Sequence, residues 1–164
     1  MEIKVATAED LPVIQKLAET IWPVSYAGII TGEQISYMLK LFYNPQALKI
    51  QHEKGHQFVI AFTNHIPIGF ASFSQKSEKE FSTFRLHKLY VLTTLHAKGI
   101  GSFLLDYVCI QSKNTGGDLL ELNVNKSNPA TIFYAKKGFT IFKEEILEIE
   151  NGYVMDDYVM VKAL

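Results

Sequence analysis

The fold is decided by the stretch Leu89-Tyr90-Val91-Leu92-Thr93-Thr94-Leu95-His96-Ala97-Lys98-Gly99-Ile100-Gly101-Ser102. An apolar segment ends, a short loop follows, and a helix opens on the two glycines. The first turn of a helix leaves backbone N–H groups unpaired and carries a partial positive charge. Glycine there removes the Cβ that would keep a phosphate from these donors. Lys98 adds a full charge, so the stretch predicts a diphosphate site.

Other interpretations of the same glycines are weaker. Gly99 and Gly101 alone are also compatible with a tight strand-to-helix turn that binds nothing. A Rossmann dinucleotide site is disfavoured because Leu104 stands where a third glycine is needed. A Walker loop is excluded because no Gly-Lys-Ser or Gly-Lys-Thr ends the run.

The stretch resembles the acetyl-CoA signature of the GNAT superfamily, Gln/Arg-x-x-Gly-x-Gly/Ala, with His96 at the first position and Gly99 and Gly101 at the glycine positions. His96 departs from the usual Gln or Arg, and its charge depends on pH. The preceding strand resembles the family strand that pairs with the pantetheine arm. The resemblance implies cofactor contacts from Leu89, Tyr90, Val91, His96, Ala97, Lys98, Gly99, Ile100, Gly101 and Ser102.

A second match is Asn128-Pro129-Ala130-Thr131-Ile132-Phe133-Tyr134-Ala135-Lys136-Lys137-Gly138-Phe139, which resembles the family pattern Asn-x-x-Ala-x-x-x-Tyr-x-x-x-Gly-Phe. The match implies that Asn128 bonds the pantetheine or a bound water and that Lys136 contacts the cofactor. Asn128 as a plain helix cap and Lys136 on a solvated face are the alternatives. The tail from 151 to 160 is similar to bacterial members, polyamine acetyltransferases among them.

The resemblance implies direct attack of a neutral amine on the thioester of acetyl-CoA. Tyr134 would then protonate the coenzyme A sulfur, since a tyrosine hydroxyl stays protonated at pH 7. The alternative for Tyr134 is a packing role. The strand from Leu89 to Val91 would offer a backbone N–H to the thioester oxygen.

The base and the acceptor contacts are candidates of a different kind. His87 stands where many family members carry a glutamate, and a histidine is suited to taking a proton from an ammonium. A packed or surface-facing His87 is the alternative. Trp22 and Tyr26 are candidates to hold a cationic amine by cation–π attraction, or equally to close the core.

Two other functions use different features. His52, Glu53 and His56 spell the H-E-x-x-H pattern of zinc peptidases, but Gly55 predicts that the helix stops before His56, which takes its ring off the shared face. No metal site is therefore expected. A non-catalytic acyl-CoA sensor is the second alternative, and cofactor binding without turnover would indicate it.

Size and composition favour one cytoplasmic domain. The chain has 164 residues, a net charge of −1 and one cysteine, so a single domain without disulfides is expected. The resemblance implies that residues 1–164 form one acyl-CoA N-acyltransferase (GNAT) domain. Nothing resembles a signal peptide or a membrane span, and no basic patch points to nucleic acid. The expected partner is a small-molecule or peptide amine. A homodimer is left open, as are the acceptor and the length of the acyl group.

Hydrophobic spacing predicts an α/β class with a mixed sheet and helices on both faces. The resemblance implies a GNAT fold, whose mostly antiparallel sheet would have six to seven strands. Thr7–Asp10 resembles a capping box ahead of a first helix, and Pro23 is expected to end or kink that helix. Helices are expected at 32–41, 45–54, 100–114 and 128–137, and strands at 3–6, 58–62, 68–73, 84–92, 120–124, 140–150 and 153–161. Hairpin turns are expected over 64–67 and at Asn151-Gly152.

Overall fold

The computed structural model describes residues 1–77 and 82–164. The chain divides into two compact units. Unit 1 is Met1–Ser74 with Lys88–Val108, and unit 2 is Gln75–His87 with Cys109–Leu164. Strands β3 and β4 and helix α4 each contribute residues to both units.

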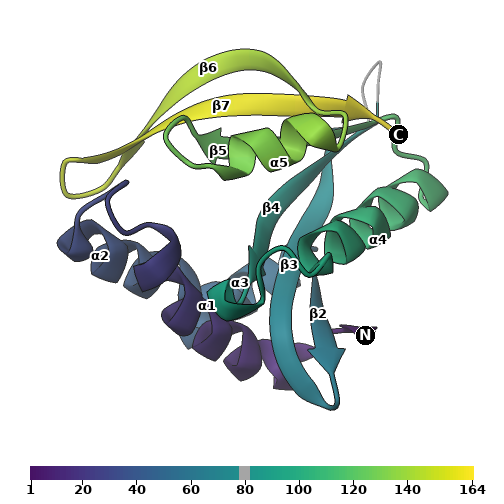
Figure 1. Ribbon diagram of the computed structural model, residues 1–164, viewed down its shortest axis with the longest axis horizontal. Coiled ribbons are helices and arrows are strands. Elements are labelled where there is room, and N and C mark those ends of the chain that lie inside the picture. Colours follow the sequence, from purple (N-terminus) through teal and green to yellow (C-terminus); the bar gives the residue numbers. More distant parts are fainter. Residues whose placement is uncertain (78–81) are drawn as a thin grey trace. The chain divides into compact units, whose positions relative to one another are not determined.

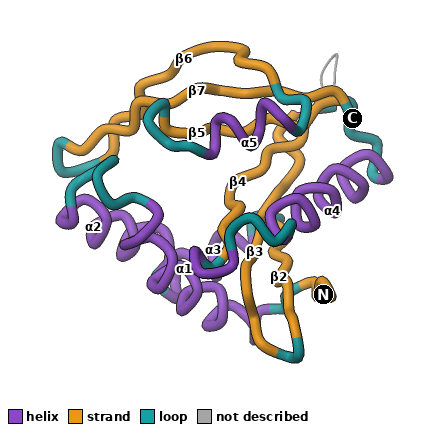
Figure 2. The backbone as a smooth tube through the Cα atoms, viewed as in Figure 1, coloured by secondary structure: helices purple, strands orange, loops and turns teal. Residues whose placement is uncertain are grey.

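The elements follow the expected order along the chain (Figures 1 and 2). They are β1 (Glu2–Val5), α1 (Leu11–Ser25), α2 (Gly32–Tyr43), α3 (Pro45–Glu53), β2 (Gln57–Thr63), β3 (Ile66–Ser77), β4 (Thr83–Val91), α4 (Ile100–Asn114), β5 (Leu119–Asn125), α5 (Ala130–Lys136), β6 (Thr140–Ile149) and β7 (Tyr153–Ala163). Short 3-10 turns precede α1 at Ala8–Asp10 and α4 at Thr93–Leu95.

In unit 1, β1 pairs with β2 and β2 with β3, both antiparallel. The β2–β3 turn is shorter than expected. Asn64 and His65 alone have positive φ angles, 48° and 63°, as a two-residue hairpin loop requires, whereas Ile66 and Pro67 already belong to β3. The buried faces of these strands bear Phe58, Ile60 and Phe70.

The first helix starts as expected and ends later than expected. The capping box is present, and the Thr7 amide donates to Asp10 Oδ2 at 2.9 Å. Pro23 does not end the helix, because α1 runs on to Ser25 and the Tyr26 amide still reaches the Trp22 carbonyl at 3.0 Å. Proline removes one internal hydrogen bond, and the turns on either side of it remain bonded.

In unit 2, β4 and β5 run parallel, with Arg85 opposite Glu121. Strand β7 pairs antiparallel with both β5 and β6. Asn151 and Gly152 form the β6–β7 turn with φ angles of 71° and 75°, which confirms the predicted hairpin. Helix α5 lies alongside β5 (Figure 1).

The hydrogen-bonded strand order is β1-β2-β3-β4-β5-β7-β6. Over the described residues 1–77 and 82–164, seven mostly antiparallel strands with α-helices between them confirm the predicted α/β class and GNAT fold. Over the residues that the structure describes, none of the helices has the length and apolar character needed to cross a membrane.

Candidate active site

The strand segment Leu89–Val91 of unit 1 is fixed by a close approach of β3. A Cβ built on Gly69 would lie 2.8 Å from the Tyr90 carbonyl oxygen and 3.3 Å from the Val91 Cα. Any side chain at 69 would therefore push the two strands apart. Just beyond the strand, the Leu92 amide donates to the Ile68 carbonyl at 2.9 Å. Sequence reasoning missed Gly69. A glycine inside an apolar strand can indicate that another part of the backbone comes close, but the sequence does not tell which part.

The loop that leaves β4 is tied back to the strand by the side chain of His96. The ring Nε2 of His96 lies 3.2 Å from the Val91 carbonyl oxygen, so this nitrogen donates to the backbone in the matching tautomer. Ala97 and Gly99 then adopt positive φ angles of 65° and 78°. With Nε2 donating to the backbone, Nδ1 of the neutral ring is an acceptor, so His96 can donate to a cofactor phosphate only when both ring nitrogens carry a proton.

Helix α4 begins with amides that no earlier turn of the helix can satisfy. Its first main-chain bond is donated by Phe103 to the Gly99 carbonyl at 2.9 Å, so the amides of Ile100, Gly101 and Ser102 precede the helical ladder. Gly99 has no side chain to cap them, and a Cβ built on it would meet no atom within 4 Å. Backbone donors, open space and the exposed Lys98 suit an anionic group such as a pyrophosphate.

The burial of neighbouring residues holds this helix start in place. Ile100 is 4% exposed, and Leu104 and Leu105 are fully buried on the same helix. The glycine loop is therefore attached to a rigid element. The requirement for glycine at position 99 is conformational as well as steric, because a φ of 78° strains any residue with a side chain.

An aromatic cluster of unit 1 places the hydroxyl of Tyr90. The rings of Trp22 and Tyr26 have centroids 4.5 Å apart, and the Tyr26 and Tyr90 hydroxyls lie 3.0 Å apart. Trp22 is 4% and Tyr26 is 7% exposed. Trp22 and Tyr26, the two residues predicted to bind the acceptor amine, thus lie in a packed aromatic cluster with Tyr90 of β4.

Lys88, on β4, is a half-buried cation that sequence reasoning did not single out. Its Nζ donates to Gln51 Oε1 at 2.7 Å and lies 5.4 Å from the ring centroid of Tyr43 and 5.8 Å from that of Phe58. Burial lowers the pKa of Lys88 to about 8. A single lysine in an apolar strand was the available signal, but its partners are distant in sequence.

In unit 2, Asn128 caps the helix that carries the second signature. Its Oδ1 accepts from the Ala130 amide at 2.9 Å, and its carbonyl accepts from the Thr131 amide at 3.1 Å. The helix begins at Ala130, two residues after the start of the predicted range of 128–137. With Oδ1 engaged, a bond from Asn128 to a ligand would use its Nδ2 amide group.

Tyr134 is held by the turn that ends α5. Gly138 has a φ of 89°, and the Phe139 amide returns to the Tyr134 carbonyl at 3.1 Å. The Tyr134 ring then lies between those of Phe133 and Phe139, at centroid distances of 5.2 and 5.6 Å, and the residue is 8% exposed.

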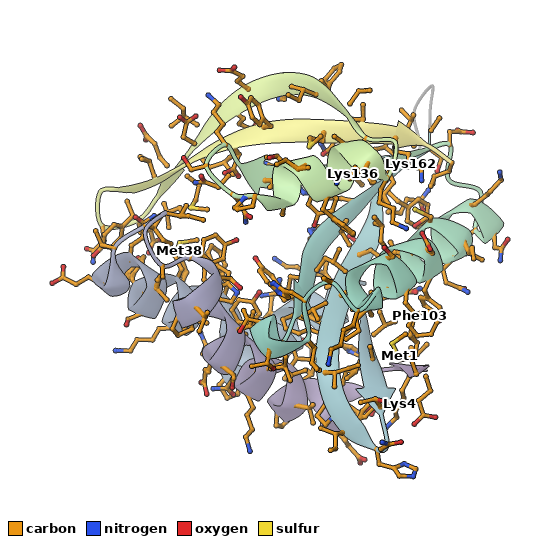
Figure 3. The ribbon with its side chains drawn as sticks, viewed as in Figure 1. Met1, Lys4, Met38, Phe103, Lys136 and Lys162 are labelled. Atoms are coloured by element: carbon orange, nitrogen blue, oxygen red, sulfur yellow. The ribbon has the colours of Figure 1, made fainter. Side chains whose placement is uncertain are left out.

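The exposed side chains at the end of α5 are cationic. Lys136 is exposed on the last turn of the helix, and Lys162 of β7 lies near the same end (Figure 3). Lys162 Nζ is 5.9 Å from the centroid of the Phe139 ring. This end of unit 2 is positively charged.

The half-buried His87 follows Arg85 by two residues on β4. Arg85 donates to Glu121 Oε1 at 3.0 Å and to Asn123 Oδ1 at 2.7 Å, which makes one face of the β4–β5 pair strongly polar. Sequence reasoning did not select Glu121 or Asn123. The signal was present, because polar residues spaced by two interrupt an otherwise apolar strand.

The zinc-peptidase pattern lacks the helix it needs. Helix α3 ends at Glu53 and Gly55 has a φ of 91°, which confirms the expectation that His56 lies outside the helix. Burial lowers the pKa of His56 to about 4, and the charges of Lys88 and Lys54 act in the same direction.

Comparison with known proteins gives consistent results. A family model described as the acetyltransferase (GNAT) domain matches residues 26–161, a range with segments of both units. No curated protein sequence matches the chain.

Among solved structures, the chain is similar to the PaiA N-acetyltransferase of Thermoplasma acidophilum in complex with coenzyme A, with 24% identity, 100% of both chains covered and a TM-score of 0.80. A GCN5-related N-acetyltransferase of Rhodopseudomonas palustris is 21% identical, with 99% and 95% covered and a TM-score of 0.83. The yncA structure of Salmonella typhimurium with its cofactor acetyl-CoA is 19% identical, with 100% and 94% covered and a TM-score of 0.67.

Proposed function

Because the chain belongs to the GNAT acetyltransferase family, it transfers an acetyl group from acetyl-CoA, and we propose that the acceptor is a primary amine of a small molecule or a peptide. The observation that carries the proposal is the start of α4, where three backbone amides precede the helical ladder beside an open Gly99. Acetyl-CoA contributes the thioester that the amine attacks.

Unit 1 has the groups for binding and polarisation. The amides of Ile100, Gly101 and Ser102 donate hydrogen bonds to the pyrophosphate, and the charge of Lys98 adds to the attraction. The segment Leu89–Val91 runs along the pantetheine, and one of its N–H groups bonds the thioester oxygen as negative charge develops there. Gly69 fixes the position of this segment. Trp22 and Tyr26 support Tyr90, and their direct contact with the amine stays a prediction.

Unit 2 has the groups for proton transfer. His87 takes a proton from the acceptor ammonium, and the neutral nitrogen then forms a bond to the acetyl carbon. As the carbon–sulfur bond breaks, the Tyr134 hydroxyl gives its proton to the departing thiolate. Asn128 bonds the pantetheine through Nδ2, and Lys136 adds charge for the cofactor. The nitrogen loses its second proton to water as the amide forms, and the proton on His87 returns through water to the tyrosine. The net reaction therefore gives an amide, a thiol and one proton released to solvent.

The binding test uses a matched pair of glycines at the two ends of α4. Gly99 and Gly116 have similar φ angles, 78° and 87°, and neither would bring a Cβ within 4 Å of another atom. Alanine therefore strains both positions to a similar degree, by about 1 kcal/mol. We expect Gly99→Ala to weaken coenzyme A binding at least tenfold in titration calorimetry, and Gly116→Ala to leave it unchanged. No coenzyme A affinity in the wild-type protein would refute the proposal.

Turnover is tested by release of free thiol from acetyl-CoA, corrected for hydrolysis, over polyamines, amino acids, aminoglycosides and peptide N-termini. Acetylation of at least one class is expected. Tight coenzyme A binding with no turnover across the panel would indicate a sensor instead of an enzyme acting on these amines.

We also infer one catalytic domain over residues 1–164, because the matching family range has segments of both units. A cytoplasmic location and a homodimer are further proposals. Chromatography with light scattering and cell fractionation would test them.

A further inference from the structure

Polar residues of several strands of unit 2 share one face of the sheet, where Val159 and Val161 of β7 lie opposite Asn123 and Glu121. Arg85 of β4 is opposite Glu121 of β5, and Asp157 of β7 is opposite both Asn125 of β5 and Glu145 of β6. The alternate residues of β5, which are Leu120, Leu122 and Val124, are buried. Side chains alternate along a strand, so the polar residues share the opposite face.

Most charges on this face have partners. Lys76 and Arg85 both pair with Glu121. Glu145 Oε2 accepts a hydrogen bond from the side-chain Nδ2 of Asn123 at 2.9 Å, and Glu145 Oε1 lies 3.4 Å from Lys143 Nζ. The Glu145 side chain is 30% exposed, so solvent reaches this part of the face.

Asp157 differs from these residues. It is 4% exposed, and its buried Oδ1 has no hydrogen-bond partner within the described part of the chain. Burial raises the pKa of Asp157, and the charges of Glu145 and Asp156 raise it further, while Asn123 and Arg85 act against the shift. The Asn123 side chain hydrogen-bonds the Asp157 carboxylate, so the unmet demand lies at Oδ1. A buried anionic oxygen without a partner is costly, and a bound cation would remove that cost.

We propose that Asp157 binds a positively charged group of the acceptor, and that the acceptor is therefore an amine that carries a second cation. This proposal rests on the acetyltransferase function proposed above. Asp157 is a poor place for the reacting nitrogen itself, because a neighbouring anion keeps an ammonium protonated and the nucleophile must be neutral. The cation beside Asp157 is thus a group that stays charged, while His87, on β4, serves the reacting amine.

The test compares cadaverine, which has two amines, with pentylamine, which has one. Steady-state kinetics are measured for the wild type, Asp157→Asn and Asp156→Asn. Asp156 is the matched control: it is the adjacent residue on β7, it is exposed, and it pairs with Lys126.

We expect the wild type to prefer cadaverine. Asp157→Asn should raise the KM for cadaverine about 10- to 100-fold and leave kcat/KM for pentylamine and coenzyme A affinity unchanged. Asp156→Asn should leave all three unchanged.

Equal losses for both amines in Asp157→Asn, or no loss for either, would overturn the proposal. A measurement on the wild type alone covers a variant that does not fold: with coenzyme A present, cadaverine should raise the Tm more than pentylamine does, and equal shifts would overturn the proposal. If the wild type acetylates pentylamine and not cadaverine, the acetyltransferase function stands and the assignment of Asp157 fails. If cadaverine binds through Asp157 without any turnover, the assignment stands and the enzymatic function fails.

Discussion

Two helices of this protein start after a strand and a short loop, and they start differently. At α5, the Asn128 side chain already accepts from the Ala130 amide. At α4, the preceding residue is Gly99, which has no side chain, and three amides precede the helical ladder. Helices α2 and α3 resemble α5, with Thr31 and Asn44 as side-chain caps. The difference teaches that a missing cap, more than the helix itself, marks a place for an anion.

Two charged residues withdrawn from solvent, half-buried Lys88 and buried Asp157, also differ in whether their polar atoms have hydrogen-bond partners. Lys88 of unit 1 has Gln51 as a hydrogen-bond acceptor and two aromatic rings nearby. Asp157 of unit 2 has an oxygen with no partner among the described residues. We interpret the first as a structural group and the second as a ligand group.

The largest expected effect comes from placing a carboxylate in the first turn of each helix. Ser102 and Ile132 both hold the third position, in α4 and α5 respectively. We expect Ser102→Asp to weaken coenzyme A binding about 100-fold, because the new carboxylate repels the phosphates. The same carboxylate interacts favourably with the helix dipole, so the helix itself should not be destabilised. Ile132→Asp should keep wild-type affinity in calorimetry. Equal affinities in the two variants would end the contrast between the helix starts.

Lys88 gives a pH-dependent stability. The folded chain loses this proton near pH 8, whereas the unfolded chain holds it to about 10.5. Between these values the unfolded state binds more protons, so the free energy of unfolding rises with pH, by about 2–3 kcal/mol at most. Burial raises the pKa of Tyr43 well above 10, which acts oppositely at higher pH, so urea unfolding is best measured between pH 7 and 9.5.

Lys88→Met should abolish this rise. Lys49→Met, at an exposed lysine of α3, should retain it. A flat profile in the wild type would show that Lys88 is not desolvated and would weaken its contrast with Asp157.

Removal of the caps separates stability from binding. Asn44→Ala and Asn128→Ala each remove one side-chain acceptor, so each should lower the free energy of unfolding by about 1 kcal/mol. Only Asn128→Ala should also raise the KM for acetyl-CoA, by several-fold. If both variants changed KM equally, Asn128 would be a cap and nothing more.

The smallest effect is expected at the rim of the glycine loop. Lys98 is exposed, so Lys98→Ala should weaken coenzyme A binding about three- to fivefold at low salt and less at high salt. Lys113→Ala, at the other end of α4, should have no effect at either salt concentration. A salt-independent loss at Lys98 would contradict a purely electrostatic role.

Local signals predicted most of the fold. Asn151-Gly152 fixed a turn and Gly138 a helix end because both act through their own φ angles. The loop at Gly99 could be predicted for the same reason, because its positive φ angle is a local property of the glycine. Of the two outcomes expected at Pro23, a helix end and a kink, the helix end is wrong, since one lost hydrogen bond does not outweigh the bonded turns around it.

Long-range partners could not be predicted. Gly69 matters through the Tyr90 carbonyl, Lys88 through Gln51, and Asp157 through neighbours on two other strands. Each of these contacts joins residues far apart in the chain. The sequence shows that a polar residue or glycine interrupts an apolar strand, but only the fold shows what it meets.

The empty position at Gly69 has a consequence for how this protein can vary. Even the smallest side chain there would meet the Tyr90 carbonyl oxygen at 2.8 Å. A substitution at 69 would therefore act on catalysis by displacing a strand, without touching any reactant. A screen for inactive variants should recover position 69 alongside the proton-transfer residues, with folded protein and impaired acetyl-CoA use as its signature.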